Sequence, residues 1–509
     1  MIRAARNLAR LVGIARTLAR YDALEGLEAL GVVPALTWTL RRLGRPRRDM
    51  AGKRLGERLA AAAQALGPSF IKLGQALSTR ADLLGEECAG DLARLRDRLP
   101  PFPGPRARDI VARELGHEID ELFESFDEEP VAAASIAQVH FAVTSDGREV
   151  AVKVLRPDIE KAFARDLELL FWLARLIERT QPKWRRLRPV AAVQVFADVV
   201  AVEMDLRLEG AAAAELAENF ADDPGYRVPA VDWPRTARRV LTTERVHGIP
   251  IDQRDALIAA GHDLDAVLEI AARATFHQVF RDGFFHGDPH PGNMFVDADG
   301  RVNVVDFGIM GRLDRDTRRY LAEMLLGFLT GDYARVAEVH FRAGYVPADK
   351  SVGAFTQACR SIGEPIMGLS AGEISVARLL AQLFQITETF GMATQPHLLL
   401  LQKVLMVSEG VGRGLNPDAN MWQLARPLIE DWAAQNMGPE ARVRAVAEAA
   451  IDTAQRLPRL LARGERMLDH LAAGQTPNPG NPRRPAPGPW AWPLLIGAAL
   501  LVALVSLVL

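Results

Sequence analysis

Apolar and polar positions follow two different periods along the chain. Residues 51–98 are rich in alanine and have helical spacing, with Gly67-Pro68 as the interruption. A second helical stretch follows the Pro/Gly break at 100–105 and is predicted to end near Phe126. From Val131 onward the pattern changes to short apolar, β-branched runs. The change of spacing therefore predicts helices before about residue 130 and strands immediately after it.

The strand pattern is clearest in a predicted hairpin. Residues 131–144 and 148–154 are apolar runs of strand length, and Ser145-Asp146-Gly147 between them suits a hairpin turn. Further strands are predicted at 228–231, 239–246, 294–296 and 302–305. Helices are predicted at 160–180, 190–219 and 253–281, and again after the last of these strands to about 470. The helix at 190–219 places Val195, Val199, Val202 and Leu206 on one face. Strands followed by helices, with a loop-rich seam between them, indicate an α+β fold with two lobes.

The last twenty residues, 490–509, contain no charged side chain. A helix of that length spans roughly the 30 Å hydrocarbon core of a bilayer at about 1.5 Å per residue. Trp490 and Trp492 suit the membrane interface, and Arg483 and Arg484 favour the cytoplasmic side for everything upstream. The sequence therefore predicts a transmembrane tail anchor after a Pro/Gly-rich linker at 471–489.

The first 48 residues are strongly basic, with ten arginines and three acidic residues. Leu8, Leu11, Ala15 and Leu18 recur at helical spacing, so they form one apolar stripe on a basic helix. Such a helix suits an anionic membrane surface. Two alternatives remain: a helix docked on the protein's own core, and an organellar transit peptide of similar composition.

Composition is that of an ordinary globular protein, with 49% hydrophobic and 25% charged residues in 509. The net charge of −2 gives no indication of a nucleic-acid partner. Cys88 and Cys359 cannot form a disulfide framework, which fits a reducing compartment.

Lys153 ends the run Val150-Ala151-Val152-Lys153 on the second strand of the hairpin. A lysine at this place matches the strand lysine that pairs the phosphates of ATP in kinases. Only seven of the 62 basic residues are lysines. A compact ammonium group suits this role, and arginine does not replace it well.

Two later motifs supply the other parts of a phosphoryl-transfer site. Asp288 and Asn293 are five residues apart in the loop 286–293, the spacing of a kinase catalytic acid and metal-binding amide. Asp306, in Val305-Asp306-Phe307-Gly308, is the expected main Mg²⁺ ligand. Together with Lys153 these residues predict a site for ATP with Mg²⁺. The alternative of a zinc site at His286, Asp288 and His290 lacks a fourth ligand in the motif.

Two familiar kinase features are absent from the sequence. No GxGxxG precedes the hairpin, and Ala132, Ala133, Ala134 and Ser135 stand in its place. Alanine does not adopt positive φ as readily as glycine, so a stiffer loop is expected to contact the nucleotide there. No Ala-Pro-Glu follows Asp306, so the usual peptide-docking segment is not expected.

These motifs together resemble the UbiB/ADCK family of atypical kinase-like proteins over about residues 5–345. Its marks here are Lys72-Leu73-Gly74-Gln75, the alanine-rich loop, and Glu203-x-Asp205 leading into Arg207-Leu208-Glu209. The resemblance implies that Lys153 pairs with Glu209 and that Glu203 and Asp205 meet the Lys72 and Gln75 motif in a regulatory contact over the cleft. It also implies that 241–246, including Thr243, Glu244 and Val246, receive the adenine.

The resemblance further implies a membrane-bound ATPase with little protein phosphorylation in trans, which supports ubiquinone assembly. The expected partners are anionic lipids, lipophilic quinone precursors and ubiquinone-biosynthesis enzymes, at the bacterial inner membrane with the kinase-like domain in the cytoplasm. Family members often carry two C-terminal spans, so the single span here leaves oligomerisation, a homodimer included, open. The alternatives are a small-molecule kinase of the aminoglycoside or choline type and a nucleotide-binding pseudokinase scaffold.

The expected organisation has six parts. They are basic membrane-proximal helices (1–50), a helical extension with the Lys72 motif (51–130), a kinase-like N-lobe (131–246), a C-lobe (247–470), the linker (471–489) and the anchor (490–509).

Overall fold

A computed structural model of the chain describes residues 2–24, 47–78, 85–93, 95, 99–180, 188–367, 386–387, 389–392, 395–417, 427–429 and 431–432. The chain divides into two units, and the first, Met1–Arg426, holds every residue of the predicted site. No helix in the described ranges is long and apolar enough to cross a membrane. The predicted linker and anchor, 471–509, lie outside those ranges.

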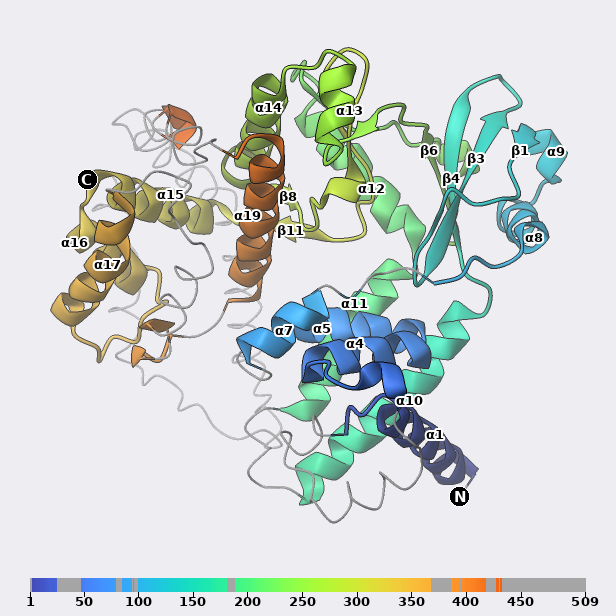
Figure 1. Cartoon of the computed structure of the whole chain (residues 1–509), viewed down its shortest axis with the longest axis horizontal. Helices are drawn as coiled ribbons and strands as arrows, with labels where there is room; N and C mark the ends of the chain where they lie inside the picture. Colours follow the sequence, from blue (N-terminus) through green and yellow to red (C-terminus); the bar gives the residue numbers. More distant parts are fainter. Residues whose placement is uncertain are drawn as a thin grey trace, which may run out of the picture. The chain divides into compact units, whose positions relative to one another are not determined.

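The predicted hairpin is present at the centre of a five-stranded antiparallel sheet (Figure 1). The strand order is β1-β3-β4-β6, with β2 paired to β3. The strands are β1 (Phe123–Phe126), β2 (Ala132–Ala133), β3 (Ala137–Thr144), β4 (Glu149–Leu155) and β6 (Val240–Glu244). Val150, Val152 and Val154 are buried in β4. Because strand side chains alternate between faces, Lys153 lies on the opposite face of the sheet.

One face of this sheet is covered by α8 (Gly104–Leu115) and α9 (Ile119–Leu122). Ile110 and Val111 of α8 share an apolar core with Phe123, Val150 and Val152 of the sheet. The sheet and its covering helices therefore begin well before residue 131. α8 and β1 share one apolar core with β3 and β4, although the expected N-lobe begins at 131.

The connection from β4 to β6 contains α10 (Ile159–Thr180), α11 (Pro189–Glu203) and α12 (Leu206–Asn219). The single helix predicted at 190–219 was wrong, because it is broken between Glu203 and Leu206. Asp205 there adopts an extended conformation and its side chain accepts a hydrogen bond from the N–H of Arg207, which caps α12. The break also separates the expected apolar face, since Val195 is exposed whereas Leu206 is buried.

The helices before the sheet pack on one another and on α10 (Figure 1). They are α1 (Ile2–Arg20), η1 (Arg48–Met50), α4 (Leu55–Leu66), α5 (Pro68–Ser78) and α7 (Glu86–Ala93). Gly67, with φ of 106°, makes the break between α4 and α5. Arg10 of α1 donates two hydrogen bonds, of 2.9 and 3.1 Å, to Asp166 of α10, and Arg6 pairs with Glu168. The basic helix α1 is therefore docked on the protein's own helices, which was the alternative to a free membrane-facing helix.

The second half of this unit contains short strands and helices. One sheet has the order β5-β10-β9-β7, and a separate ribbon pairs β8 with β11. The strands are β5 (Tyr226–Arg227), β7 (Ile249–Pro250), β8 (Phe284–His286), β9 (Met294–Val296), β10 (Val302–Val304) and β11 (Met310–Arg312). The helical segments are η3 (Trp233–Arg235), α13 (Arg254–Ala259), α14 (Leu264–Phe276), the π-helix η4 (His277–Asp282) and η5 (Pro291–Asn293). β9 and β10 were predicted, whereas β8 and β11 were not.

Within the described residues after β11, the longer helices are four in number. They are α15 (Arg315–Thr330), α16 (Tyr333–Arg342), α17 (Val352–Met367) and α19 (Pro396–Leu415). The first three share an apolar core that includes Tyr333, Val336 and Phe355. In contrast, α19 lies beside α14 and β11, and its Val411 and Leu415 are part of the core beneath the second sheet (Figure 1).

Candidate active site

Lys153 contacts two other predicted site residues. Its Nζ donates to Glu209 Oε1 at 2.6 Å and to Asp306 Oδ1 at 2.9 Å. Glu209 is buried in the first turn of α12, whereas the Asp306 side chain is 51% exposed. The contact predicted between Lys153 and Glu209 is therefore present, and Asp306 joins it from a part of the chain 153 residues away.

Lys153 and the two carboxylates alter one another's pKa values. Burial by itself lowers the pKa of Lys153, but the carboxylates of Asp306 and Glu209 outweigh burial and raise it. Lys153 in turn holds the pKa of Asp306 well below its usual range. Burial raises the pKa of Glu209, and Lys153 opposes that rise. The lysine is thus a permanent cation beside an ionised Asp306 at neutral pH.

Asp306 has a strained backbone, with φ of 65°. Left-handed conformations are uncommon for residues other than glycine and are concentrated at functional sites. The next residue, Phe307, is buried and packs edge-on against His286, with ring centroids 5.8 Å apart. The buried Phe307 therefore fixes the segment, and the strained residue turns its carboxylate toward Lys153.

The loop from His286 to Asn293 is held by its own hydrogen bonds. Every backbone N–H between these two residues has an acceptor: Gln278 Oε1, Ile309 O, His286 Nδ1, Asp288 O, His290 Nδ1 and His290 O, in chain order. His286 Nδ1 accepts from the Asp288 N–H at 3.1 Å, so its Nε2, 3.4 Å from Val305 O, carries the proton. Burial lowers the pKa of His286, which suits this neutral form.

The orientation of the Asn293 side chain suits a magnesium ligand. Its Nδ2 donates to Asp288 O at 3.2 Å, and because a carbonyl oxygen only accepts, this bond assigns Oδ1 as the oxygen for a metal ion. The Asn293 carbonyl accepts from the N–H of Val305, the residue before Asp306. One amide oxygen and one carboxylate are the hard donors that Mg²⁺ takes beside water and phosphate oxygens. The residues present fit the expected ion.

The zinc alternative does not fit. No cluster of three or more His, Cys, Asp or Glu side chains suited to a metal ion occurs among the residues that the structure describes. Both ring nitrogens of His286 already have partners within the fold, and His290 Nδ1 accepts from the Gly292 N–H at 3.0 Å. These histidines shape the loop.

Lys72 of α5 forms an ion pair with Glu203 at the end of α11, with Nζ 3.0 Å from Oε2. Both side chains are largely buried, at 12% and 9% exposed. Lys72 also adds to the stronger effect of Lys153 in lowering the pKa of Asp306. Asp205, expected at the same contact, pairs instead with Arg207 and caps α12. Gln75 is half-buried on the same helix as Lys72.

The alanine-rich segment is an ordered turn at the start of the hairpin. Ala132 and Ala133 pair with Val139 and Gln138 of β3, and the Ala134 N–H donates to Ala137 O. Arg156 donates to Ala134 O at 2.8 and 3.0 Å, and Ser135 is fully buried. None of Ala132, Ala133 or Ala134 has positive φ, as the sequence led us to expect.

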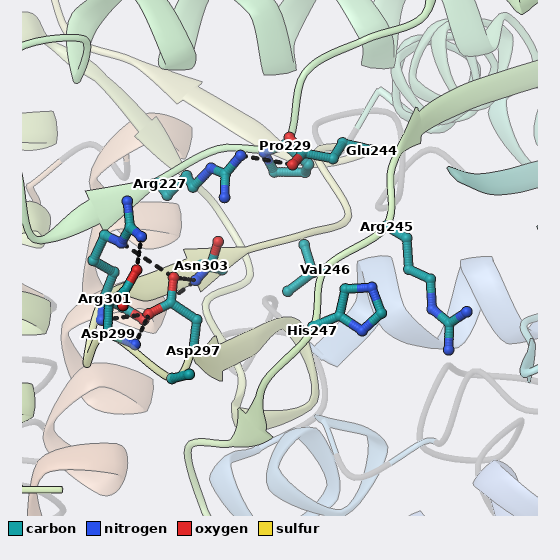
Figure 2. Close-up of a pocket in the computed structure, with 11 residues that line it drawn as sticks. Arg227, Pro229, Glu244, Arg245, Val246, His247, Asp297, Asp299, Arg301 and Asn303 are labelled. Carbon is teal, nitrogen blue, oxygen red and sulfur yellow. Dashed lines mark hydrogen bonds and ion pairs between the residues drawn. The ribbon is translucent and has the colours of Figure 1, made fainter. Parts of the chain in front are cut away.

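The segment expected to receive adenine, 241–246, begins within β6 and continues just beyond its end. Thr243 lies within the strand opposite Ala151, and the Glu244 N–H donates to Ala230 O. A cavity of about 220 Å³ lies beside Glu244 and Val246, and Figure 2 shows the residues that line it. Its lining does not include Lys153, Asp288, Asn293 or Asp306. Charged groups in this lining pair with each other, Arg227 with Glu244 and Arg301 with Asp297, so the cavity is not the phosphate site.

Sequence reasoning missed one residue that contacts the site. Lys403 of α19 places its Nζ 2.8 Å from Asp288 Oδ1. Lys403 is the third of the seven lysines to lie at this site, after Lys153 and Lys72. The scarcity of lysine was a signal that could have identified it, but nothing in the sequence shows which loop α19 meets.

Comparisons with known proteins agree with this geometry. Residues 94–340 match the family model for the ABC1 atypical kinase-like domain, and residues 359–420 match that for the UbiB helical domain. A protein of Marinobacter nauticus named "Probable protein kinase UbiB" is 44% identical over 395 residues, which cover 77% of this chain and 72% of that one. A protein of the same name from Pseudomonas paraeruginosa is 39% identical over 505 residues, 97% of this chain and 93% of that one.

A solved structure shares the fold. It is the complex of Rv3197 with erythromycin from Mycobacterium tuberculosis, with a TM-score of 0.51 and 26% identity over 72% of this chain and 95% of that one. The Lys153–Glu209 pair and the 286–293 loop lie within the segment that matches the atypical kinase-like family model. The chain therefore belongs to the UbiB family of ABC1 atypical kinase-like proteins.

Proposed function

We propose that this chain is a membrane-anchored, kinase-like ATPase that uses ATP and Mg²⁺ to support ubiquinone biosynthesis. The observation that carries the ATP chemistry is the contact of Lys153 with both Glu209 and Asp306. A lysine held between two carboxylates, next to an Asp and Asn loop, supplies the cation, the metal ligands and the acceptor carboxylate that phosphoryl transfer needs.

The residues have distinct roles in the proposed reaction. Lys153 binds the phosphates, Asn293 and Asp306 hold Mg²⁺, and Mg²⁺ neutralises phosphate charge when bound. Asp288 orients the acceptor and takes its proton. When water is the acceptor, its oxygen bonds to the γ-phosphorus and the bond from that phosphorus to the bridging oxygen breaks. ADP leaves with the electron pair, and the proton of water passes to Asp288.

Three features favour a substrate other than a peptide. An alanine-rich turn stands in place of the glycine-rich loop of protein kinases, and the sequence after Asp306 contains no Ala-Pro-Glu. In addition, the buried Lys72–Glu203 pair joins α5 to the end of α11, immediately before the helix that carries Glu209. We therefore assign the ATP turnover to the handling of lipophilic quinone precursors for ubiquinone-biosynthesis enzymes, at the inner membrane of a bacterium.

Phosphate release tests this function directly. The full chain is purified in mild detergent and assayed with ATP and Mg²⁺, with and without vesicles of anionic lipid and a phenolic quinone precursor. The proposal predicts Mg²⁺-dependent release that the vesicles and the phenol increase. Asp288→Asn, which removes the proton acceptor, is expected to lower the rate by about a hundredfold or more while nucleotide still binds.

The other outcomes identify the alternatives. Nucleotide binding without phosphate release under any of these conditions would show a pseudokinase scaffold. Transfer of the phosphate to a small hydroxylated compound, detected by mass spectrometry, would show a small-molecule kinase. Either result would contradict the ATPase proposal.

A further inference from the structure

The ion pair between Lys403 and Asp288 joins the C-terminal helix α19 to the proposed catalytic loop. The two residues are 115 positions apart, and their side chains are 38% and 31% exposed, so both border solvent at the site. Asp288 lies in the segment that matches the atypical kinase-like model, whereas Lys403 lies in the segment that matches the UbiB helical model. The second segment therefore contributes a charged group to the site.

α19 is fixed where it meets the loop. Its C-terminal end is in the core through Val411 and Leu415, and Arg254 donates to the Leu415 carbonyl at 3.1 Å. Nearer the loop, a Cβ on Gly287 would lie 3.2 Å from Leu400 Cδ1, which shows how closely α19 approaches the residue before Asp288. Lys403 thus extends from a helix that is anchored on both sides of it.

The loop itself supplies no cation next to Asp288. The residues between Asp288 and Asn293 are Pro289, His290, Pro291 and Gly292. His290 Nδ1 accepts a hydrogen bond from the Gly292 N–H, so this ring nitrogen does not donate to Asp288. Lys153 is engaged with Glu209 and Asp306. Among the ion pairs of the described residues, Lys403 alone pairs with Asp288.

We propose that Lys403 is a positioning residue for Asp288, which it holds in the orientation needed to receive the acceptor's proton. A carboxylate that is otherwise free to rotate spends only part of its time in a productive geometry, and a fixed ion pair removes that freedom. The inference rests on the proposed function, since it assigns Asp288 the acceptor role. On this proposal, the segment that matches the UbiB helical model supplies a residue that acts on the active site.

The test compares three variants of the full chain with the unmodified protein: Lys403→Gln, Lys403→Arg and Lys161→Gln. Lys161 is the matched control, an exposed lysine of α10 that pairs with Asp158 just before that helix and contacts no residue of the proposed site in this ion pair. We expect Lys403→Gln to lower kcat for phosphate release by about tenfold or more, with the Kd for nucleotide changed by less than about threefold. Lys403→Arg keeps the charge and is expected to recover most of the loss, and Lys161→Gln to change neither quantity.

A second measurement does not depend on turnover. Hydrogen exchange is followed for the peptide that covers residues 286–293, in which every backbone N–H is bonded. Lys403→Gln is expected to accelerate exchange in this peptide, and Lys161→Gln to leave it unchanged. Unaltered kcat together with unaltered exchange in Lys403→Gln would overturn the proposal, as would equal losses in the Gln and Arg variants. If the unmodified protein releases no phosphate, the proposed function fails, and the exchange result alone decides whether Lys403 positions the loop.

Discussion

The carboxylate of Asp306 has two cationic partners at this site, Lys153 and the proposed Mg²⁺. In the structure it accepts from Lys153 at 2.9 Å, and in the proposed reaction Asp306 binds Mg²⁺. Lys153 also pairs with Glu209, so the lysine still has one carboxylate partner when Asp306 binds the metal ion. This arrangement turns the metal site and the phosphate-binding lysine into one electrostatic unit, in which a change at either carboxylate affects both.

His286 makes the loop sensitive to acid. Burial lowers its pKa below the usual value of about 6.5, against the opposing effect of Asp306 and Asp288. The ring is therefore neutral at pH 7, and it gains a proton only as the pH falls below about 6.5, when Nδ1 can no longer accept from the Asp288 N–H. We expect phosphate release to fall by about tenfold between pH 7 and the acidic side of that pKa.

The matched variant for this prediction is His286→Asn. Asparagine keeps an acceptor near the position of Nδ1 but does not titrate in this range. Its remaining activity should lack the acid limb in a pH–rate profile of kcat. An acid limb of the same size in both proteins would show that another group titrates.

Residues with local signals could be identified from the sequence, and those defined by distant contacts could not. Lys153, Asp288, Asn293 and Asp306 occur in short segments whose spacing is diagnostic, and the structure joins Lys153 to Asp306. The family resemblance gave Glu209 and the Lys72–Glu203 pair. The role of Asp205 as a helix cap and the contact of Lys403 with Asp288 depend on where α11 ends and where α19 packs.

At the scale of elements, the hairpin was predictable because its strands are long and its turn contains Gly147, with φ of 83°. β8 and β11 have only three residues each and pair with each other across the catalytic loop, so neither shows a period of its own. β1 follows directly after α9 and continues its apolar pattern, which hid the start of the sheet. The break before α12 depends on one capping side chain, that of Asp205.

The ion pair between Lys72 and Glu203, which connects α5 to α11, can be tested by removing its buried charges. Lys72→Met leaves the Glu203 carboxylate buried without this cation, which costs about 3 kcal/mol or more for pairs of this kind. We expect hydrogen exchange in α5 and in the last turn of α11 to accelerate accordingly. The double variant Lys72→Met/Glu203→Leu removes both charges and should recover most of the protection.

The control for the Lys72→Met variant is Lys161→Met, which breaks the exposed ion pair between Lys161 and Asp158. This control is expected to leave hydrogen exchange in α5 unchanged. Equal exchange in the Lys72→Met variant and the unmodified protein would contradict a stabilising role for this pair.

For the whole molecule, two segments are candidates for membrane contact: the basic helix α1 and the uncharged segment 490–509. Arg6 and Arg10 are paired with α10, whereas Arg16 and Arg20 of α1 are exposed. The strongest membrane signal in the sequence is the uncharged segment 490–509. We therefore expect most membrane affinity to come from that segment, with a smaller contribution from the basic helix on anionic lipid.

Vesicle flotation separates these two contributions. Removal of residues 490–509 should abolish binding to neutral vesicles and leave weaker binding to anionic ones. That remainder should decline from about 0.1 M to about 1 M salt, as the screening length falls from about 10 Å to about 3 Å. It should also decline in Arg16→Gln/Arg20→Gln. Salt-insensitive binding of the shortened chain would contradict an electrostatic role for α1.

The central claim, that Lys153, Asn293 and Asp306 form a site for ATP with Mg²⁺, is tested most directly by calorimetric titration of the full chain with ATP, with and without Mg²⁺. The account predicts that Mg²⁺ strengthens binding and that Asp306→Asn abolishes this dependence. Asp120→Asn, which changes an exposed aspartate on α9, should behave as the unmodified protein does. Mg²⁺-dependent binding that persists unchanged in Asp306→Asn would contradict the metal site and the function proposed from it.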